Sequence, residues 1–172
     1  MRSSRRLGRS RFAPALEPTL PQPLPVLVLA EDWCGDVIDN LPILGNLAVA
    51  SGKLDLHIFL RDQNLDLMEQ YLNQGQFRSI PVFVFFDQQF NEIGRFIERP
   101  ASVSERRGRQ RQELAASRPE LGAADTPIAQ LPEETRVQLM TALGGLRAAD
   151  KPRDIADVVA ALQAIVNQVR AA

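Results

Sequence analysis

A short apolar run, followed by a turn and by apolar residues at helical spacing, constrains the fold of this chain most. Residues 25–30 (Pro-Val-Leu-Val-Leu-Ala) carry no charge, which is typical of a strand buried on both faces of a sheet. Beyond the turn at 31–36, the apolar residues at helical spacing are Val37, Ile38, Leu41, Leu44 and Leu47. They predict a helix that ends at Gly52. Because the apolar pattern continues past Pro42, we expect this proline to kink the helix rather than end it.

A second strand and a short helix are predicted next. Residues 54–60 alternate between apolar and polar side chains, which indicates a strand with one buried face. Asp62 and Asn64 are alternative N-caps for a helix over 65–72, which stops near Gly75.

The sheet is completed by two further predicted strands. Residues 79–86 (Ser-Ile-Pro-Val-Phe-Val-Phe-Phe) predict the third, with proline near its start, and the turn at 87–91 leads into a fourth that ends around Ile97. A β-α-β crossover joins parallel strands, whereas the closing hairpin joins antiparallel ones. The predicted fold class is therefore α/β, with a mixed central sheet flanked by helices.

The remainder, residues 99–172, is predicted to be a helical extension. Three helices are expected: a basic one over 103–117, a second that opens at Pro132, and a third over 154–170 capped by Asp154. The third carries an apolar stripe that must be covered: Ile155, Val158, Val159, Leu162, Ile165, Val166 and Val169. The sequence leaves open whether the sheet of the same chain or a second copy of the chain covers this stripe. Both a monomer and a homodimer are therefore consistent with the sequence.

Residues 1–25 differ from the rest of the chain. Five arginines precede the first acid, Glu17, and five prolines follow Phe12, so the composition opposes packing. The default interpretation is a disordered basic arm; a targeting segment and residues upstream of the true start are the alternatives. No stretch has the roughly 18 apolar residues of a membrane span, so we expect a cytoplasmic protein without a membrane partner.

Charge and the rare residue types exclude several kinds of site. The 20 basic and 21 acidic residues leave a net charge of −1, so the whole chain does not attract nucleic acid. Cys34 is the only cysteine, which excludes an intrachain disulfide and a zinc site built from several thiolates. The only histidine, His57, falls on the polar side of its strand and is predicted to be a surface residue. No metal site is predicted.

Three features together resemble the thioredoxin family. Residues 33–37 (Trp-Cys-Gly-Asp-Val) look like the Trp-Cys-Gly-Pro-Cys active site of thioredoxins, at the same strand-to-helix turn. Pro42 lies where that family has its helix-kinking proline, and Ile80-Pro81 resembles the family's Ile-Pro pair, whose peptide bond is cis and faces the thiol. The resemblance implies a thioredoxin-like core over residues 26–98.

The resemblance also implies the roles of the site residues. Cys34 would be the catalytic nucleophile, and the expected substrate-binding residues are Trp33, Gly35, Asp36, Ile80 and Pro81. The N-terminus of a helix stabilises a thiolate, whereas the nearby carboxylates of Glu31, Asp32 and Asp36 favour the neutral thiol. These effects oppose each other, so the sequence leaves the activation of Cys34 open.

Two departures from the family pattern limit the chemistry. Val37 stands where thioredoxins have the second cysteine, and Val28 where they have a buried aspartate. A dithiol cycle needs a resolving thiol, so a self-sufficient reductase is excluded. We expect a monothiol redox protein, without a bound cofactor, that forms mixed disulfides through Cys34 with a protein or a low-molecular-weight thiol. The alternative is a redox-inactive thioredoxin-fold module that binds a protein partner.

Overall fold

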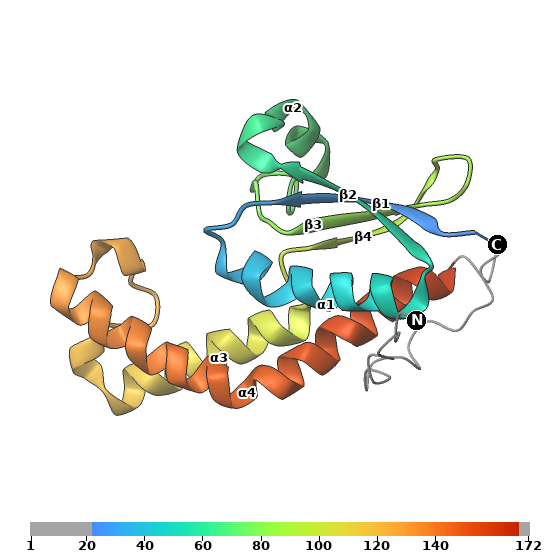
Figure 1. The fold of residues 1–172 in the computed structure, drawn as a ribbon. Helices are drawn as coiled ribbons and strands as arrows, with labels where there is room; N and C mark the ends of the chain where they lie inside the picture. Colours follow the sequence, from blue (N-terminus) through green and yellow to red (C-terminus); the bar gives the residue numbers. More distant parts are fainter. Residues whose placement is uncertain (1–21, 169–172) are drawn as a thin grey trace, which may run out of the picture. The chain divides into compact units, whose positions relative to one another are not determined.

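A mixed four-stranded sheet lies at the centre of the computed structural model, which describes residues 22–168 (Figure 1). The strands are β1 (Leu24–Ala30), β2 (Leu54–Leu60), β3 (Val82–Phe86) and β4 (Glu92–Ile97). Their spatial order is β2-β1-β3-β4, with β1 parallel to β2 and antiparallel to β3, and with β3 and β4 antiparallel. The predicted mixed α/β fold is confirmed.

The helices follow the strands in the expected order. They are α1 (Gly35–Ser51), η2 (Arg61–Gln63), α2 (Leu65–Met68), η3 (Glu69–Tyr71), α3 (Ala101–Ser117), η4 (Pro119–Leu121), η5 (Ile128–Gln130) and α4 (Glu133–Gln168). Helix α1 contains Pro42 and ends where Gly52 takes a left-handed conformation with φ of 62°. The N–H of Gly52 donates to the Ala48 carbonyl oxygen at 2.8 Å, which satisfies one of the last carbonyls of the helix.

The segment after β2 is more broken than the sequence predicts. Residues 61–71 form two 3₁₀ turns and one short α-helix instead of a continuous helix. Asn64 does not cap this helix with its side chain, because its Nδ2 donates back to the Leu60 carbonyl oxygen at 2.8 Å. The amide oxygen Oδ1, the atom of Asn64 that could accept from the free N–H groups of the next turn, makes no capping hydrogen bond.

The C-terminal region also differs from the prediction. The expected separate helices from Pro132 and from Asp154 are one helix, α4, with Pro152 inside it. Asp154 is not an N-cap, since its carboxylate pairs with the Arg106 guanidinium. Pro152 costs α4 one backbone hydrogen bond and crowds the carbonyl four residues before it. The helix nevertheless continues, and the apolar stripe beyond Pro152 is buried at Val158, Leu162, Ile165 and Val166.

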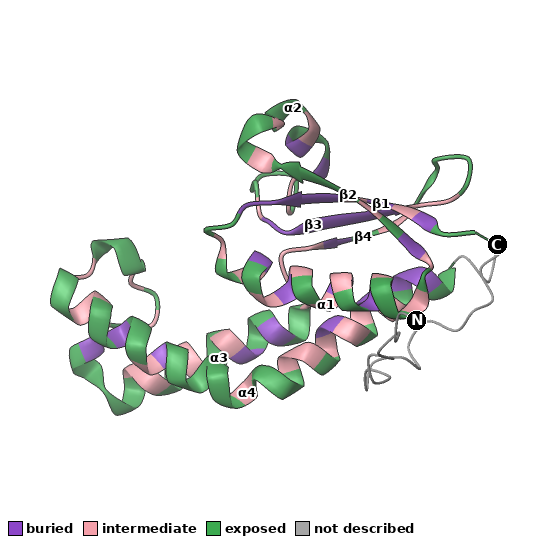
Figure 2. Ribbon diagram, viewed as in Figure 1, coloured by how far each residue is buried: buried purple, intermediate pink, exposed green. Residues whose placement is uncertain are grey.

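Two compact units divide the described residues. Unit 1 contains the residues up to Arg99 together with those from Val158 onward, and unit 2 contains Pro100–Asp157. The core of unit 1 lies around β1 and β3, which are buried along most of their length (Figure 2). The end of α4 adds four buried side chains to that core: Val158, Leu162, Ile165 and Val166. The core of unit 2 is smaller and consists of Leu121, Leu139 and Leu143.

Most of the predicted arm over 1–25 lies outside the described residues; only its last four, 22–25, are inside them, and β1 begins among these at Leu24. Within residues 22–168, no helix combines the length and the apolar character needed to cross a membrane.

Candidate functional site

Cys34 stands at the junction between β1 and α1. It is the N-cap residue of α1, with φ of −87° and ψ of 120°, and its carbonyl oxygen accepts the N–H of Ile38 at 3.0 Å. Its own N–H donates to the Glu31 carbonyl oxygen at 3.4 Å, which closes the turn. The side chain is half-buried and makes no capping hydrogen bond. The thiol therefore lies where the first N–H groups of the helix favour a negative charge.

The thiol faces the residues that precede β3. Cys34 Sγ donates to the Ile80 carbonyl oxygen at 3.5 Å, although 46 residues separate the two in sequence. The Ile80-Pro81 peptide bond is cis, as the resemblance implied, and both residues are buried. The structure thus brings together three of the predicted site residues, Cys34, Ile80 and Pro81.

Asp36 is held in an ion pair. Its Oδ2 lies 2.6 Å from Arg99 Nη1, and the two side chains are 15% and 21% exposed. Arg99 also pairs with the Glu98 carboxylate. A carboxylate in the first turn is favourable for the helix, and the guanidinium offsets the repulsion that Asp36 would exert on a thiolate at Cys34. Sequence reasoning missed Arg99, because it lies 63 residues from Asp36 and in no recognisable motif.

A second link connects α1 with the segment after β4. Asn40, which is buried, donates from Nδ2 to the Glu98 carbonyl oxygen at 2.9 Å. The N–H of Glu98, which has φ of 62°, donates to the Pro81 carbonyl oxygen at 2.7 Å. Asn40 and Glu98 therefore support the position of Pro81 opposite the thiol. The available sequence signal was a polar residue within the apolar pattern of α1.

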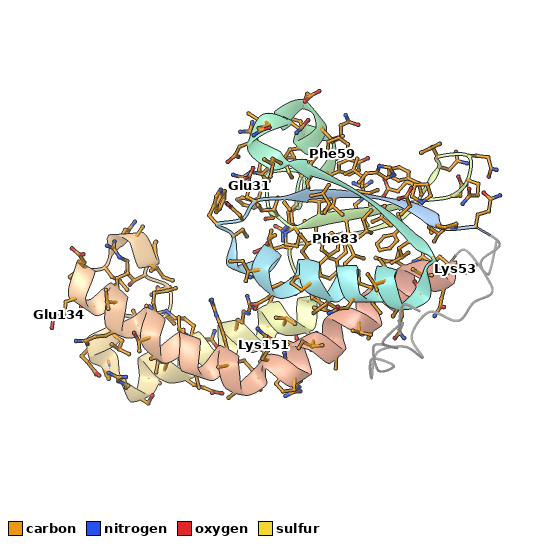
Figure 3. The ribbon with its side chains drawn as sticks, viewed as in Figure 1. Glu31, Lys53, Phe59, Phe83, Glu134 and Lys151 are labelled. Atoms are coloured by element: carbon orange, nitrogen blue, oxygen red, sulfur yellow. The ribbon has the colours of Figure 1, made fainter. Side chains whose placement is uncertain are left out.

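The other acids near Cys34 point elsewhere. Glu31 is only 8% exposed, and its Oε1 accepts the backbone N–H of Asp62 at 2.7 Å, so it fixes the start of η2 (Figure 3). Asp32 is exposed. Of the three carboxylates expected to oppose a thiolate, Glu31 and Asp36 thus have protein partners.

Trp33 forms the exposed side of the turn. Its side chain is 60% exposed, and the Arg61 guanidinium lies 4.9 Å from the centroid of its ring. Arg61 is further held by Asp62, at 2.7 Å, and by the Arg78 carbonyl oxygen, at 3.2 Å. A planar cation over an indole ring is favourable, so Trp33 is supported on one face while most of it remains accessible.

The two positions that depart from the thioredoxin pattern are apolar and buried. Val37 is 5% exposed, and Val28 is fully buried between Ile58 of β2 and Phe83 of β3. Neither position offers a thiol or a carboxyl group. His57 is exposed in β2, with Nε2 at 3.1 Å from Asp55 Oδ2, as expected of a surface histidine. Within residues 22–168, no three side chains of His, Cys, Asp or Glu gather closely enough to hold a metal ion.

Comparisons with known proteins agree with this geometry. A model of the family described as thioredoxin matches residues 14–111. A crystal structure of a protein of unknown function from Pseudomonas aeruginosa is similar to the chain with a TM-score of 0.58 and 22% identity, over 92% of this chain and 73% of that one. An HIV epitope-scaffold is similar with a TM-score of 0.51 and 19% identity, over 87% and 68% of the two chains. No curated protein matches.

The two structural likenesses show the fold, and the family match covers more than half of the 172 residues, including Cys34 and Pro81. Cys34, Ile80 and Pro81 lie on the expected elements, with the thiol at the N-terminus of α1 opposite a cis proline. The chain belongs to the thioredoxin family.

Proposed function

We propose that Cys34 is the nucleophile of a monothiol exchange reaction with disulfides of proteins or of low-molecular-weight thiols. The observation that carries this proposal is the place of the thiol: at the N-cap of α1, with Sγ 3.5 Å from the Ile80 carbonyl oxygen. The helix N-terminus supports a thiolate, and the thiol is half-buried rather than sealed in the core.

The reaction proceeds in two balanced steps. In the first, the Cys34 thiolate attacks one sulfur of a disulfide, the S–S bond breaks, and a mixed disulfide forms while the other sulfur leaves as a thiolate and takes up a proton. In the second, an external thiolate attacks the mixed disulfide and releases Cys34. Together the two steps release one partner sulfur as a thiol and leave the other in a mixed disulfide with the external thiol. A second external thiolate attacks the external sulfur of that bond, so both partner sulfurs end as thiols and the two external thiols end joined in a disulfide.

The second step needs an external thiol because Val37 occupies the position three residues after the nucleophile. A compartment that keeps low-molecular-weight thiols reduced, such as the cytoplasm, would supply it. The reaction requires no bound cofactor. The partner is therefore a protein or small-molecule thiol rather than nucleic acid or a membrane.

The experiment compares folded and unfolded protein. Purified chain is incubated with oxidised glutathione at neutral pH, and the glutathione adduct is followed by intact mass, in buffer and in concentrated denaturant. We expect the native thiol to react faster than the unfolded one, because only the folded chain places Cys34 at a helix N-terminus. A Cys34→Ser variant is expected to form no adduct and to keep the circular dichroism of the wild type. A native rate equal to or below the unfolded rate would contradict the proposal.

A second experiment tests whether the valine at position 37 limits the exchange to one thiol. Val37→Cys adds a thiol in the first turn of α1, with a small change in side-chain volume. In this variant we expect the glutathione adduct to decay into an intramolecular disulfide between positions 34 and 37, detected by mass after alkylation. An adduct that persists as in the wild type would show that the site does not support exchange.

A redox-inactive binding module is the second candidate, and the exposed ring of Trp33 favours it. The two candidate functions differ in whether partner binding requires the Cys34 thiol. A partner that binds the Cys34→Ser variant as tightly as the wild type, with no mixed disulfide trapped, would support the binding module. A partner retained only through a reducible bond to Cys34 would support the redox protein.

A further inference from the structure

The two residues that follow β4, Glu98 and Arg99, contact both sides of the candidate site. Arg99 reaches the start of α1, where its Nη1 lies 2.6 Å from Asp36 Oδ2. Glu98 reaches the other side: its N–H donates to the Pro81 carbonyl oxygen at 2.7 Å, and its Oε2 accepts from Asn73 Nδ2 at 3.1 Å. These two residues therefore connect the first turn of α1 with the segment that precedes β3.

The backbone at this point is held by several hydrogen bonds, which place the Arg99 side chain. Glu98 has φ of 62°, a conformation that residues other than glycine adopt rarely and that the surrounding contacts must hold. Asn40 Nδ2 donates to the Glu98 carbonyl oxygen at 2.9 Å. The N–H of Arg99 donates to the Ile97 carbonyl oxygen at 2.8 Å. The Arg99 guanidinium, which also pairs with the Glu98 carboxylate, is thus directed towards Asp36 from a fixed backbone.

Asp36 carries a negative charge next to the thiol. Cys34 is the N-cap residue of α1, and Asp36 is the second residue of that helix. A carboxylate at this distance favours the neutral thiol over the thiolate. The Asp36 side chain is 15% exposed, so water screens its charge less than that of a surface carboxylate. The guanidinium of Arg99 therefore supplies compensation that the solvent does not.

We propose that Arg99 is a positioning residue for thiol exchange, because it keeps the Asp36 carboxylate paired and so lets the N-terminus of α1 stabilise a thiolate at Cys34. This inference rests on the proposed role of Cys34 as a nucleophile. Without Arg99, Asp36 loses the cation that compensates it, and the fraction of reactive thiolate falls. A unit charge several ångströms away changes that fraction by about tenfold. A more basic thiolate is also the stronger nucleophile, so the net loss of rate is about threefold.

Alkylation by iodoacetamide reports on this thiolate, since Cys34 is the only cysteine of the chain. The rates are followed by intact mass on the full chain at neutral pH. We expect Arg99→Met to react about threefold more slowly than the wild type. Asp36→Asn, which keeps the guanidinium and removes the acid, is expected to react faster than the wild type. The double variant lacks both charges and is expected to regain the wild-type rate, which a merely structural role of Arg99 would not allow.

The matched control is Arg95→Met, which removes another arginine of the same unit. Arg95 lies in β4, pairs with Glu92 at 2.6 Å and has a side chain that is 42% exposed. This variant is expected to react like the wild type, and circular dichroism compares the folding of all variants. If Arg99→Met does not fold, the comparison of Asp36→Asn with the wild type still tests the inference.

Four results would overturn the inference: Arg99→Met as fast as the wild type, a double variant as slow as Arg99→Met, Asp36→Asn no faster than the wild type, or Arg95→Met as slow as Arg99→Met. Failure of the proposed function would look different. The native thiol would then react with oxidised glutathione no faster than the unfolded one, while the iodoacetamide rates of the variants would keep the expected order.

Discussion

Arg106 gives the sharpest stability prediction in unit 2. Arg106 is 6% exposed. Its Nη2 lies 2.6 Å from Asp157 Oδ2, and its Nη1 pairs with the Asp154 carboxylate. Arg106→Met keeps most of the apolar stem and removes the guanidinium. The variant leaves two carboxylates of α4 without their shared cation, one turn apart on the same helix.

The expected cost is about 3 kcal/mol. Removing one partner of a buried ion pair costs roughly 3–5 kcal/mol, because the remaining charge is left uncompensated. Asp154 and Asp157 have side chains that are 16% and 28% exposed, so water partly solvates them. Arg107 Nη2 also stays 3.8 Å from Asp154 Oδ2, and Ser102 Oγ donates to Asp157 Oδ2 at 3.0 Å, so the cost falls at the lower end. The matched control is Arg109→Met on the same helix. Arg109 and Glu105 are both more than half exposed, with their charged atoms 3.9 Å apart, so that change should cost below about 0.5 kcal/mol.

The ion pair also predicts a pH dependence. The hydrogen bond from Arg106 holds the pKa of Asp157 below its usual value, and the hydrogen bond to Asp157 raises the pKa of Arg106. Because the folded-state pKa of Asp157 is lowered, its contribution to stability is complete above the unfolded value of about 3.9 and is lost as the pH falls through the folded value. The contribution of Arg106 would be lost only at strongly alkaline pH.

Urea unfolding followed by circular dichroism, at neutral pH and in steps down to acid, measures both effects. The free energy of unfolding of the wild type should fall more steeply in acid than that of Arg106→Met, so the two should converge. Asp87 and Glu120 also have lowered pKa values, but these arise from Asn91 and Arg118 and affect both proteins alike. The reasoning is refuted if Arg106→Met costs no more than Arg109→Met, or if the difference between wild type and variant does not shrink in acid.

Two further substitutions concern unit 1. Phe83→Ala removes a fully buried ring stacked on Phe96 at 5.2 Å, and the cavity should lower the free energy of unfolding by about 3–5 kcal/mol in urea titrations. Asn40→Ala leaves the Glu98 carbonyl without its side-chain donor and should cost about 1–3 kcal/mol in the same assay. Val49→Ala, at an exposed position of α1, is the control for both and should change stability by less than about 0.5 kcal/mol.

The strands were predictable because their signals are local. The uncharged run before the turn became β1, the alternating segment became β2 with the predicted bounds, and Gly52 ends α1. The continuity of α4 was not predictable in this way. Pro152 and Asp154 both suggest a boundary, but Asp154 pairs with Arg106, 48 residues away in the chain. The residues around Asp154 give no sign of this pairing with Arg106, so the local sequence pattern could not predict it.

The candidate site shows the same difference between residues in local motifs and residues that matter through distant contacts. Cys34 and Ile80-Pro81 stand in recognisable motifs, and the structure brings them together. Arg99, Asn40 and Glu98 carry no motif, and their importance comes from contacts between segments about 60 residues apart. Sequence reasoning therefore found the Cys34 thiol and the proline opposite it, and missed the side chains that hold the surroundings in place.

Helix α4 has a consequence for the order in which the protein is completed during synthesis. The side chains from Val158 to Val166 belong to the core of unit 1, yet the ribosome reaches them only after the whole of unit 2 has been made. Domains usually fold in the order of their synthesis. Here the sheet of unit 1 emerges first with part of its apolar surface uncovered, so unit 2 can fold before unit 1 is finished. A nascent chain that stops at residue 157 would expose this surface to chaperones.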